Sequence, residues 1–255
     1  MPTALIVEDE PEANKLLSML VKLRGFTTVS AFTGREAIER AGECEPDVVF
    51  LDLMLPDING YEVCRVLKSR HPTSGVPVVI VTARVAADNR LESFSNGADD
   101  YIPKPYTPDQ IFDRLAQATA WKSDLNAPQI EGSITLERAG IGSLRQLARL
   151  RSLLIARTNL GFKTVEHIFA EIQGIRTYAE RWAIDHPPTG PLALDYSLDM
   201  HHLRIRIRDH AGWIEDYRSR LPVVLSHDPE TPRFLPERID ESTAYITLNL
   251  PLEAS

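Results

Sequence analysis

The feature that most constrains the fold is a regular alternation, over the first half of the chain, of short apolar runs with amphipathic stretches. Largely β-branched runs occupy residues 3–7, 47–52, 77–83 and 100–104, and a weaker run occupies residues 27–32. Helical periodicity separates them, as in residues 11–24, where Leu16, Leu17, Leu20 and Leu23 share one predicted face. Buried strands that alternate with helices predict an α/β unit, with a five-stranded, parallel, doubly wound sheet.

Polar side chains follow these runs at the points where the strands are predicted to end. They are Glu8 and Asp9, Asp52, the pair Thr82 and Ala83, and Lys104. Because parallel strands end at one edge of a sheet, we expect three carboxylates, a hydroxyl and an ammonium to meet there. Carboxylates packed this closely repel unless a hard cation lies among them, and oxygen ligands suit Mg²⁺. The alternative is that each carboxylate only caps a helix or a strand end.

A central carboxylate beside such a cation can attack a phosphorus atom. The metal, the hydroxyl and the ammonium would then stabilise charge on the transferred oxygens. The edge of the predicted sheet therefore indicates phosphoryl chemistry.

Four motifs make residues 1 to about 122 resemble the receiver domain of bacterial two-component response regulators. They are "VEDE", "FLDLMLPDINGYEVC", "VTA" and "GADDYIPKPY", in the family's order. The resemblance implies that Asp52 is the phosphoacceptor. The remaining roles that it implies are Mg²⁺ binding by Glu8, Asp9, Asp52 and the backbone carbonyl of Met54; phosphoryl binding by Thr82, Ala83 and Lys104; an aromatic switch at Tyr101; and a cis peptide between Lys104 and Pro105.

The family also implies partners. One is a cognate sensor histidine kinase or phosphotransfer protein that supplies the phosphoryl group. A second is another copy of the chain, since Arg90, Asp99, Asp100 and Arg114 resemble charges that pair across a symmetric dimer in many such regulators. A solvated charged face is the alternative for these four residues, because exposed ion pairs contribute little to stability.

The second half of the chain has a different order of elements. Residues 123–133 are polar, contain Pro and Gly, and are interpreted as a linker between a receiver domain (1–122) and an output domain (134–255). The elements expected after the linker are a short strand (134–137), two long helices (142–157 and 162–184), a hairpin (192–198 with 203–209) and a last strand (244–250). Arg145 and Arg149 are expected on the outer face of the first helix. Two long helices against a mostly antiparallel sheet predict an α+β sandwich.

This order resembles the GHKL ATPase fold of histidine kinases and anti-sigma-factor kinases. The resemblance implies a nucleotide site at Gln173, Asp209 and Gly212. The long helix, however, has Gln173 where the family needs an Asn that holds Mg²⁺, and Gly212 is the last glycine of the chain. A phosphate-wrapping loop needs backbone geometry that bulky residues rarely adopt. We therefore expect the fold with a vestigial site, no ATP binding, and an output through an unknown protein partner.

Two alternatives for the output remain open. One is an active kinase or phosphotransferase, with His167 as a candidate phosphotransfer residue; an ordinary helix histidine is the simpler interpretation. The other is a DNA-binding transcriptional regulator, supported by Arg204, Arg206 and Arg208 on one predicted strand. Nucleic acid is not expected as a partner, because residues 125–255 hold 15 Lys+Arg against 17 Asp+Glu. A helix-turn-helix would also need three short helices.

Composition and the N-terminal sequence bear on where the protein is located and on the state of its cysteines. The net charge is −8, no apolar run is long enough to span a bilayer, and the N-terminus has no secretory pattern. The two cysteines, Cys44 and Cys64, lack metal-site spacing and read as reduced thiols. We therefore expect a cytoplasmic regulator without membrane contact, whose only expected enzymatic chemistry is phosphorylation and dephosphorylation of its own receiver domain.

Overall fold

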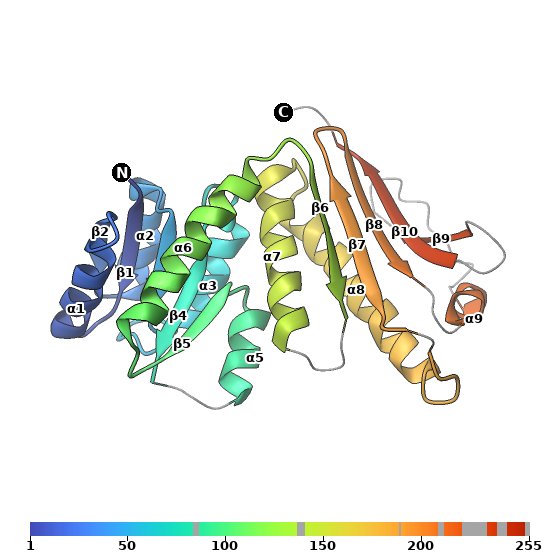
Figure 1. Cartoon of the computed structure of the whole chain (residues 1–255), viewed down its shortest axis with the longest axis horizontal. Coiled ribbons are helices and arrows are strands. Elements are labelled where there is room, and N and C mark those ends of the chain that lie inside the picture. The colour runs from blue at the N-terminus through green and yellow to red at the C-terminus, as the bar shows by residue number, and fades with distance from the viewer. Residues whose placement is uncertain are drawn as a thin grey trace. The chain divides into compact units, whose positions relative to one another are not determined.

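The computed structural model describes residues 1–83, 87–136, 141–188, 190–208, 212–220, 234–238 and 244–252. The chain divides into two compact units: Met1–Ala127 with Leu144–Arg157, and Pro128–Ser143 with Thr158–Ser255. Each unit is built around a five-stranded sheet, as Figure 1 shows. No helix in the described part of the chain is both long and apolar enough to cross a membrane.

The first unit contains the predicted parallel sheet. Its strands are β1 (Thr3–Val7), β2 (Thr27–Ala31), β3 (Val48–Leu51), β4 (Val78–Thr82) and β5 (Asp100–Pro103), in the spatial order β2-β1-β3-β4-β5. The helices are α1 (Pro11–Lys22), α2 (Gly34–Cys44), α3 (Gly60–Ser69), α4 (His71–Ser74), α5 (Ala87–Ser95) and α6 (Pro108–Leu125). Every strand pair is parallel, which confirms the five predicted strands and their doubly wound arrangement.

Helix α1 forms as expected but buries a partly different face. Its buried residues are Asn14, Leu17, Ser18 and Val21, at the i, i+3, i+4 and i+7 spacing of a helix stripe. The predicted leucine face was right for Leu17 and Leu20, which pack in or against the core, and wrong for Leu16 and Leu23, which are 54% and 73% exposed. Leucine alone was followed in that prediction, whereas the buried stripe includes two polar residues with partners inside the unit.

The expected linker is partly helix and partly strand. Helix α6 runs on to Leu125, and β6 (Ile130–Thr135) begins at Ile130. Helix α7 (Ile141–Arg157) is divided between the units, because Leu144–Arg157 belongs to the first unit and the preceding turn to the second. The structural division therefore differs from the expected boundary at residue 134.

The second unit has an antiparallel sheet with the strand order β6-β7-β8-β10-β9. Besides β6 it contains α8 (Phe162–Trp182), β7 (Ala193–Leu198), β8 (His202–Arg208), α9 (Trp213–Arg220), β9 (Leu235–Arg238) and β10 (Ala244–Pro251). The expected hairpin is β7 with β8, and the two long helices are α7 and α8. Helix α9 and strand β9 were not predicted.

Strand β8 alternates as its sequence predicts. Leu203, Ile205 and Ile207 are fully buried, whereas the arginines between them face away from the core. Asp195 on β7 lies opposite Arg206, a cross-strand pair of opposite charge. The arginine row is therefore the outer face of a half-buried strand.

Candidate functional site

Asp52 lies directly after β3, at the edge where the parallel strands end. The residue is only 5% exposed. The backbone N–H of Asp52 donates to the carbonyl of Val7 (2.9 Å), and the N–H of Met54 donates to Asp52 Oδ1 (3.0 Å). These bonds fix the loop after β3 and leave Oδ2 for a different partner.

That partner is Lys104, which follows β5. Its ammonium donates to Asp52 Oδ2 and to Glu8 Oε2, at 2.5 Å each. Burial alone would lower the pKa of Lys104, but its hydrogen bonds to the two carboxylates outweigh burial and raise this pKa. Burial raises the pKa of Glu8, and the Lys104 ammonium opposes that shift. Two buried carboxylates are thus held together by one cation.

Asp9 does not join this group in the way the sequence predicted. Asp9 is exposed, and no cluster of three metal-binding side chains occurs in the described part of the chain. The oxygen-only donor set of Glu8, Asp52 and the Met54 backbone, with Asp9 at the rim, still has the chemistry that Mg²⁺ prefers.

Thr82 and Ala83 lie beside this cluster. Thr82 ends β4 and is fully buried, Ala83 is exposed, and the N–H of Lys104 donates to the Thr82 carbonyl (2.9 Å). The expected cis peptide between Lys104 and Pro105 is present. The structure therefore brings Glu8, Asp52, Thr82 and Lys104 to one edge, as predicted.

Tyr101 is two residues before the end of β5 and is 5% exposed. Its hydroxyl is buried and has no hydrogen-bond partner within the described residues. Burial raises the pKa of this phenol, although the charge of Arg90, whose guanidinium lies 5.7 Å from the ring centroid, opposes the shift. The residue predicted as the switch is thus buried, and within the described residues its hydroxyl would break no hydrogen bond if the side chain moved.

A glycine lets α3 approach the phosphoacceptor candidate. A Cβ at Gly60 would lie 2.3 Å from the carbonyl oxygen of Asp52 and 2.7 Å from Cα of Leu53. Real Cβ atoms do not come that close to backbone, so only glycine fits at this first helical position. The N-cap Asn59 completes the turn by accepting from the N–H of Tyr61 (3.0 Å).

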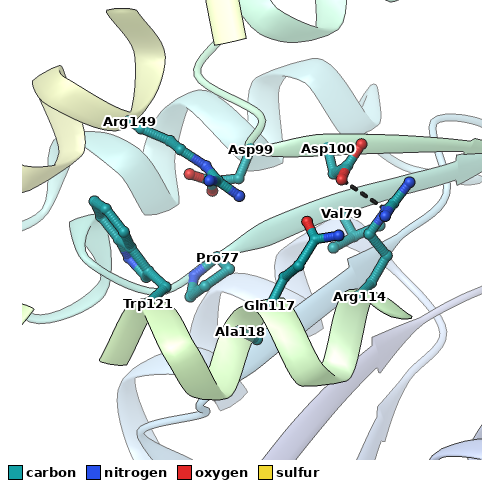
Figure 2. A pocket seen from close by; sticks show the side chains of 9 residues that line it. All are labelled: Pro77, Val79, Asp99, Asp100, Arg114, Gln117, Ala118, Trp121 and Arg149. Atoms are coloured by element: carbon teal, nitrogen blue, oxygen red, sulfur yellow. Dashed lines mark ion pairs between the residues drawn. The ribbon is translucent and has the colours of Figure 1, made fainter. Parts of the chain in front are cut away.

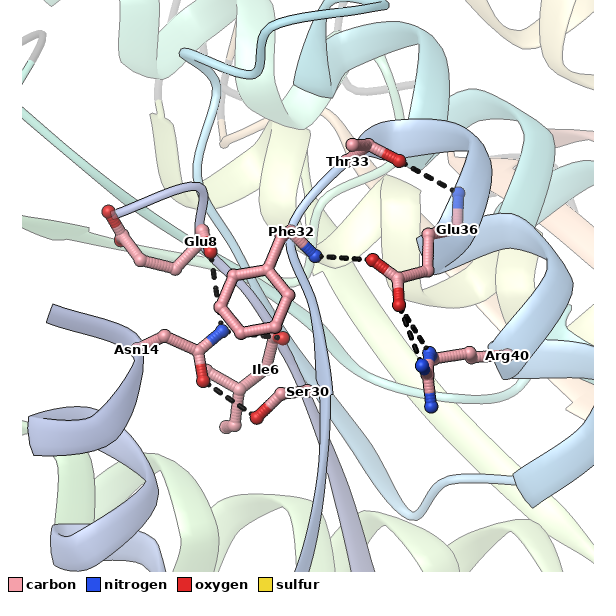
Figure 3. A network of polar contacts seen from close by, with 8 residues as sticks. All are labelled: Ile6, Glu8, Asn14, Ser30, Phe32, Thr33, Glu36 and Arg40. Atoms are coloured by element: carbon pink, nitrogen blue, oxygen red, sulfur yellow. Dashed lines mark hydrogen bonds and ion pairs between the residues drawn. The ribbon is translucent and has the colours of Figure 1, made fainter. Parts of the chain in front are cut away.

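Sequence reasoning missed a polar network that holds the end of β1 (Figure 3). Asn14 of α1 donates to the carbonyls of Ile6 (3.4 Å) and Glu8 (3.3 Å), and Ser30 donates to Asn14 Oδ1 (2.7 Å). Asn14 is 2% exposed. This side chain therefore ties α1, β1 and β2 together immediately below Glu8. Its signal was an Asn within the i, i+3, i+4 stripe of α1.

A second part of Figure 3 shows how the loop after β2 is held. Glu36 accepts from the N–H of Phe32 (2.7 Å) and pairs with Arg40 (2.7 Å), while Thr33 caps α2. The hydrogen bond from Phe32 lowers the pKa of Glu36, against the opposing effect of burial. The loop that borders the site is thus anchored by its own helix.

Three of the four charges predicted to pair across a dimer, Asp99, Asp100 and Arg114, have ion-pair partners within the first unit. Asp99 is buried and pairs with Lys68 at 2.6 Å, and it accepts from the N–H of Val78 (2.8 Å). Asp100 pairs with Arg114 (2.6 Å) and with Arg145 of α7 (2.7 Å), as Figure 2 shows for Arg114. In this arrangement neither aspartate presents an unpaired carboxylate on the surface. The placement of Arg145 on an outer face was therefore wrong.

The residues of the predicted vestigial nucleotide site are only partly described. Gln173 is half-buried on α8, Gly212 is exposed with φ +73° before α9, and Asp209 lies outside the described residues. A cluster that the sequence did not predict lies between α8 and α9. The Tyr178 hydroxyl donates to Asp216, and the Tyr178 ring lies 5.0 Å from that of Tyr217.

The histidines of the described residues do not form a metal site. His167 on α8 lies 3.6 Å from Glu171, one turn on. His201 lies in the hairpin turn and His202 begins β8, and their backbone N–H groups donate to Asp199. Their placement matches the interpretation as ordinary helix and turn residues.

Comparison with known proteins finds relatives of residues 4–116, which make up most of the first unit. A family model described as the response regulator receiver domain matches residues 4–116. The probable transcriptional regulatory protein TcrX of Mycobacterium tuberculosis is 39% identical over 113 residues, which cover 44% of this chain and 47% of that protein. The DNA-binding response regulator MtrA of Mycolicibacterium smegmatis is 39% identical over 111 residues, with 44% and 47% covered.

One relative matches over more of the chain. The transcriptional regulatory protein KdpE of Mycobacterium tuberculosis is 29% identical over 255 aligned residues, which cover 92% of this chain and 95% of that protein. The chain spans about half the length of TcrX and MtrA. The names of these relatives, as transcriptional or DNA-binding regulators, conflict with the expectation that nucleic acid is not a partner. Residues 4–116 are a response regulator receiver domain.

Proposed function

We propose that the chain is a response regulator that accepts a phosphoryl group on Asp52, and that this phosphorylation controls the C-terminal unit. The observation that carries the proposal is the pair of hydrogen bonds from Lys104 to Glu8 and Asp52. A buried carboxylate beside an ammonium and a second carboxylate is a competent acceptor for a phosphoryl group.

The reaction follows from these residues. An oxygen of Asp52 attacks the phosphorus of a phosphohistidine on a sensor kinase or phosphotransfer protein, the P–N bond breaks, and the imidazole takes a proton from solvent. Lys104 stays protonated, because its pKa is raised, and pairs with the incoming phosphoryl oxygens. Thr82 and the backbone at Ala83 would bind the same oxygens. Mg²⁺, held by Glu8, Asp9, Asp52 and the carbonyl of Met54, would neutralise the charge of the group being transferred.

The test is labelling by a small phosphoryl donor in the presence of Mg²⁺. We expect the full chain to take up one acid-stable, base-labile phosphoryl group, and Asp52→Asn to take up none. The matched control is Asp113→Asn, the same chemical change at an exposed position of α6, which should label like the wild type. Full labelling of Asp52→Asn would refute the assignment.

The target of the C-terminal unit has two candidates. The relatives' names favour DNA, since MtrA is described as DNA-binding and KdpE and TcrX as transcriptional regulators. A protein partner is supported by the acidic composition of residues 125–255 and by the long helices α7 and α8, of 17 and 21 residues. We expect a DNA-binding output to show an affinity that falls steeply with salt. Binding that phosphorylation changes but salt does not would favour the protein partner.

The GHKL-like interpretation of the C-terminal unit adds a separate prediction. The order β6, α7, α8, β7, β8 agrees with the order expected from the sequence. A vestigial site predicts no binding of Mg-ATP at micromolar concentration. Calorimetric titration of the full chain tests this, and a saturable signal in that range would instead support an active kinase.

A further inference from the structure

Arg145 makes the hydrogen bonds that join the start of the segment Leu144–Arg157 of α7 to β5 and α6. Arg145 Nη2 donates to Asp100 Oδ2 (2.7 Å) and to Gln117 Oε1 (2.9 Å), and its Nε donates to the carbonyl of Asp99 (2.9 Å). The side chain of Arg145 is 30% exposed and that of Asp100 only 9%. Charge-assisted bonds of this kind are stronger than neutral ones. The contact reaches the start of β5 and the middle of α6.

The rest of the segment is packed closely on the same unit. Arg149, one helical turn after Arg145, reaches from α7 toward Asp99 in Figure 2, and its guanidinium lies 5.8 Å from the ring centroid of Trp121. The hollow that Arg149, Asp99 and Trp121 help to line measures about 10 Å³, at or below the space that one water needs. Further along, Arg157 donates to the carbonyl of Ala127 (3.1 Å).

The residue that Arg145 binds is connected directly to the phosphorylation site. Asp100 is the first residue of β5, Tyr101 is the second, and Lys104 follows the end of the same strand. Strand β5 is paired with β4 from Asp100 opposite Val79 to Pro103 opposite Thr82. A shift of β5 along β4 therefore moves both the contact with Arg145 and the ammonium of Lys104.

We infer that Leu144–Arg157 is a latch, held by Arg145 on β5 and α6, that phosphorylation of Asp52 releases. The inference rests on the proposed function of Asp52. A phosphoryl group adds negative charge where Lys104 now joins Glu8 and Asp52, so Lys104 and β5 readjust together. Asp100 then binds Arg145 less well. Because α7 continues directly into the second unit, its release carries the signal to that unit.

Hydrogen exchange on the full chain tests the latch, with beryllofluoride as the phosphoryl analogue. We expect beryllofluoride and Mg²⁺ to speed exchange of the α7 amides about tenfold, as expected for loss of a hydrogen bond to a charged group. Arg145→Ala should show the same increase in exchange without beryllofluoride. Arg145→Lys keeps the charge but loses the guanidinium's several N–H donors, and should show a smaller increase. The matched control is Arg65→Ala, an exposed helical arginine of α3, which should leave α7 unchanged.

Reciprocity supplies a second measurement that a purely structural role would not affect. If bound beryllofluoride loosens the latch by some factor, loosening the latch must tighten beryllofluoride binding by that factor. Arg145→Ala should therefore bind beryllofluoride up to about tenfold more tightly than wild type or Arg65→Ala. Equal affinities would overturn the inference.

The failures of the two proposals are distinguishable. If beryllofluoride protects the segment around Asp52 while α7 exchange stays constant, the latch is overturned and the phosphoacceptor assignment stands. If no protection that depends on Asp52 occurs, the assignment fails and the latch loses its trigger. If the α7 amides exchange at the same rate in Arg145→Ala as in Arg65→Ala, Arg145 does not hold α7. The latch is then overturned whether or not Asp52 is the phosphoacceptor.

Discussion

The buried ion pair between Lys68 and Asp99 gives the sharpest stability prediction. The two side chains are 3% and 4% exposed and lie 2.6 Å apart. Lys68 also donates to the carbonyls of Ser74 (3.1 Å) and Val76 (2.8 Å), so its ammonium is fully surrounded by acceptors. Lys68→Met keeps most of the volume and removes the charge, which leaves Asp99 buried without its cation.

Breaking a buried pair by removing one partner costs about 3–5 kcal/mol. We expect the receiver domain of Lys68→Met to lose that much free energy of unfolding. Since about 1.4 kcal/mol is a factor of ten, the unfolding constant should rise roughly a hundredfold to a few thousandfold. Asp99→Asn in the same chain removes the orphaned charge but keeps an acceptor for the N–H of Val78. The double variant should therefore recover about 2–3 kcal/mol of the loss.

The assay is urea unfolding read by hydrogen exchange in peptides of β4 and β5, so that the receiver domain is followed separately from the second unit. The matched control is Lys15→Met, the same substitution at an exposed position of α1, which should change stability by less than about 0.5 kcal/mol. A Lys68→Met variant as stable as Lys15→Met would refute the reasoning. So would a double variant that is less stable than the sum of the single changes.

Three further predictions concern the site and its surroundings. Gly60→Ala should lower phosphoryl labelling and destabilise the receiver by about 1–3 kcal/mol, because its Cβ would lie 2.3 Å from a backbone oxygen; Gly42→Ala, with nothing within 4 Å, should stabilise by up to about 1 kcal/mol in urea unfolding. Burial raises the pKa of Cys64 to about 12, so its thiol stays protonated in the folded state and should resist alkylation at pH 9, where the unfolded thiol is half ionised. The partly exposed Cys44 should react first. Alkylation of Cys64 before the protein unfolds would contradict this prediction. Tyr101→Phe should not lower the free energy of unfolding, since the hydroxyl has no hydrogen-bond partner among the residues that the structure describes. A loss above about 1 kcal/mol would show that it has one.

The parallel sheet and the cluster of polar residues at its edge could be predicted because two independent signals agree there. Apolar runs locate the strands, and parallel strands bring their ends to one edge, so the residues that follow them must meet. Glu8, Asp52, Thr82 and Lys104 do meet, as described above. Asp9 also follows a strand end, but its side chain is exposed.

What could not be predicted depends on long-range partners of single polar residues. Asp99 and Asp100 are adjacent and were both assigned to a dimer surface, yet one turns inward to Lys68 and the other binds two arginines. Spacing along the chain does not reveal which side chain opposes them in space. The same limit applies to Arg145, which was expected on an outer face, and to Asn14, about which the sequence suggested nothing.

The arginine row of β8 bears on the output, because its side chains already have partners across the sheet. Arg204 donates to Asn249 (2.8 Å), Arg208 donates twice to the Tyr245 hydroxyl (3.0 and 2.6 Å), and Arg206 lies 5.6 Å from the centroid of the Tyr245 ring. A DNA phosphate that bound these guanidiniums would have to replace those contacts, which lowers the net gain from each ion pair. The quantity to measure is the slope of log affinity against log salt concentration, which changes by roughly one unit for each phosphate contact made by an otherwise free cation. If DNA is the target, substitution of all three arginines by glutamine should therefore change this slope by less than three units. A full loss of three units would show that this face of the sheet is the DNA-binding surface.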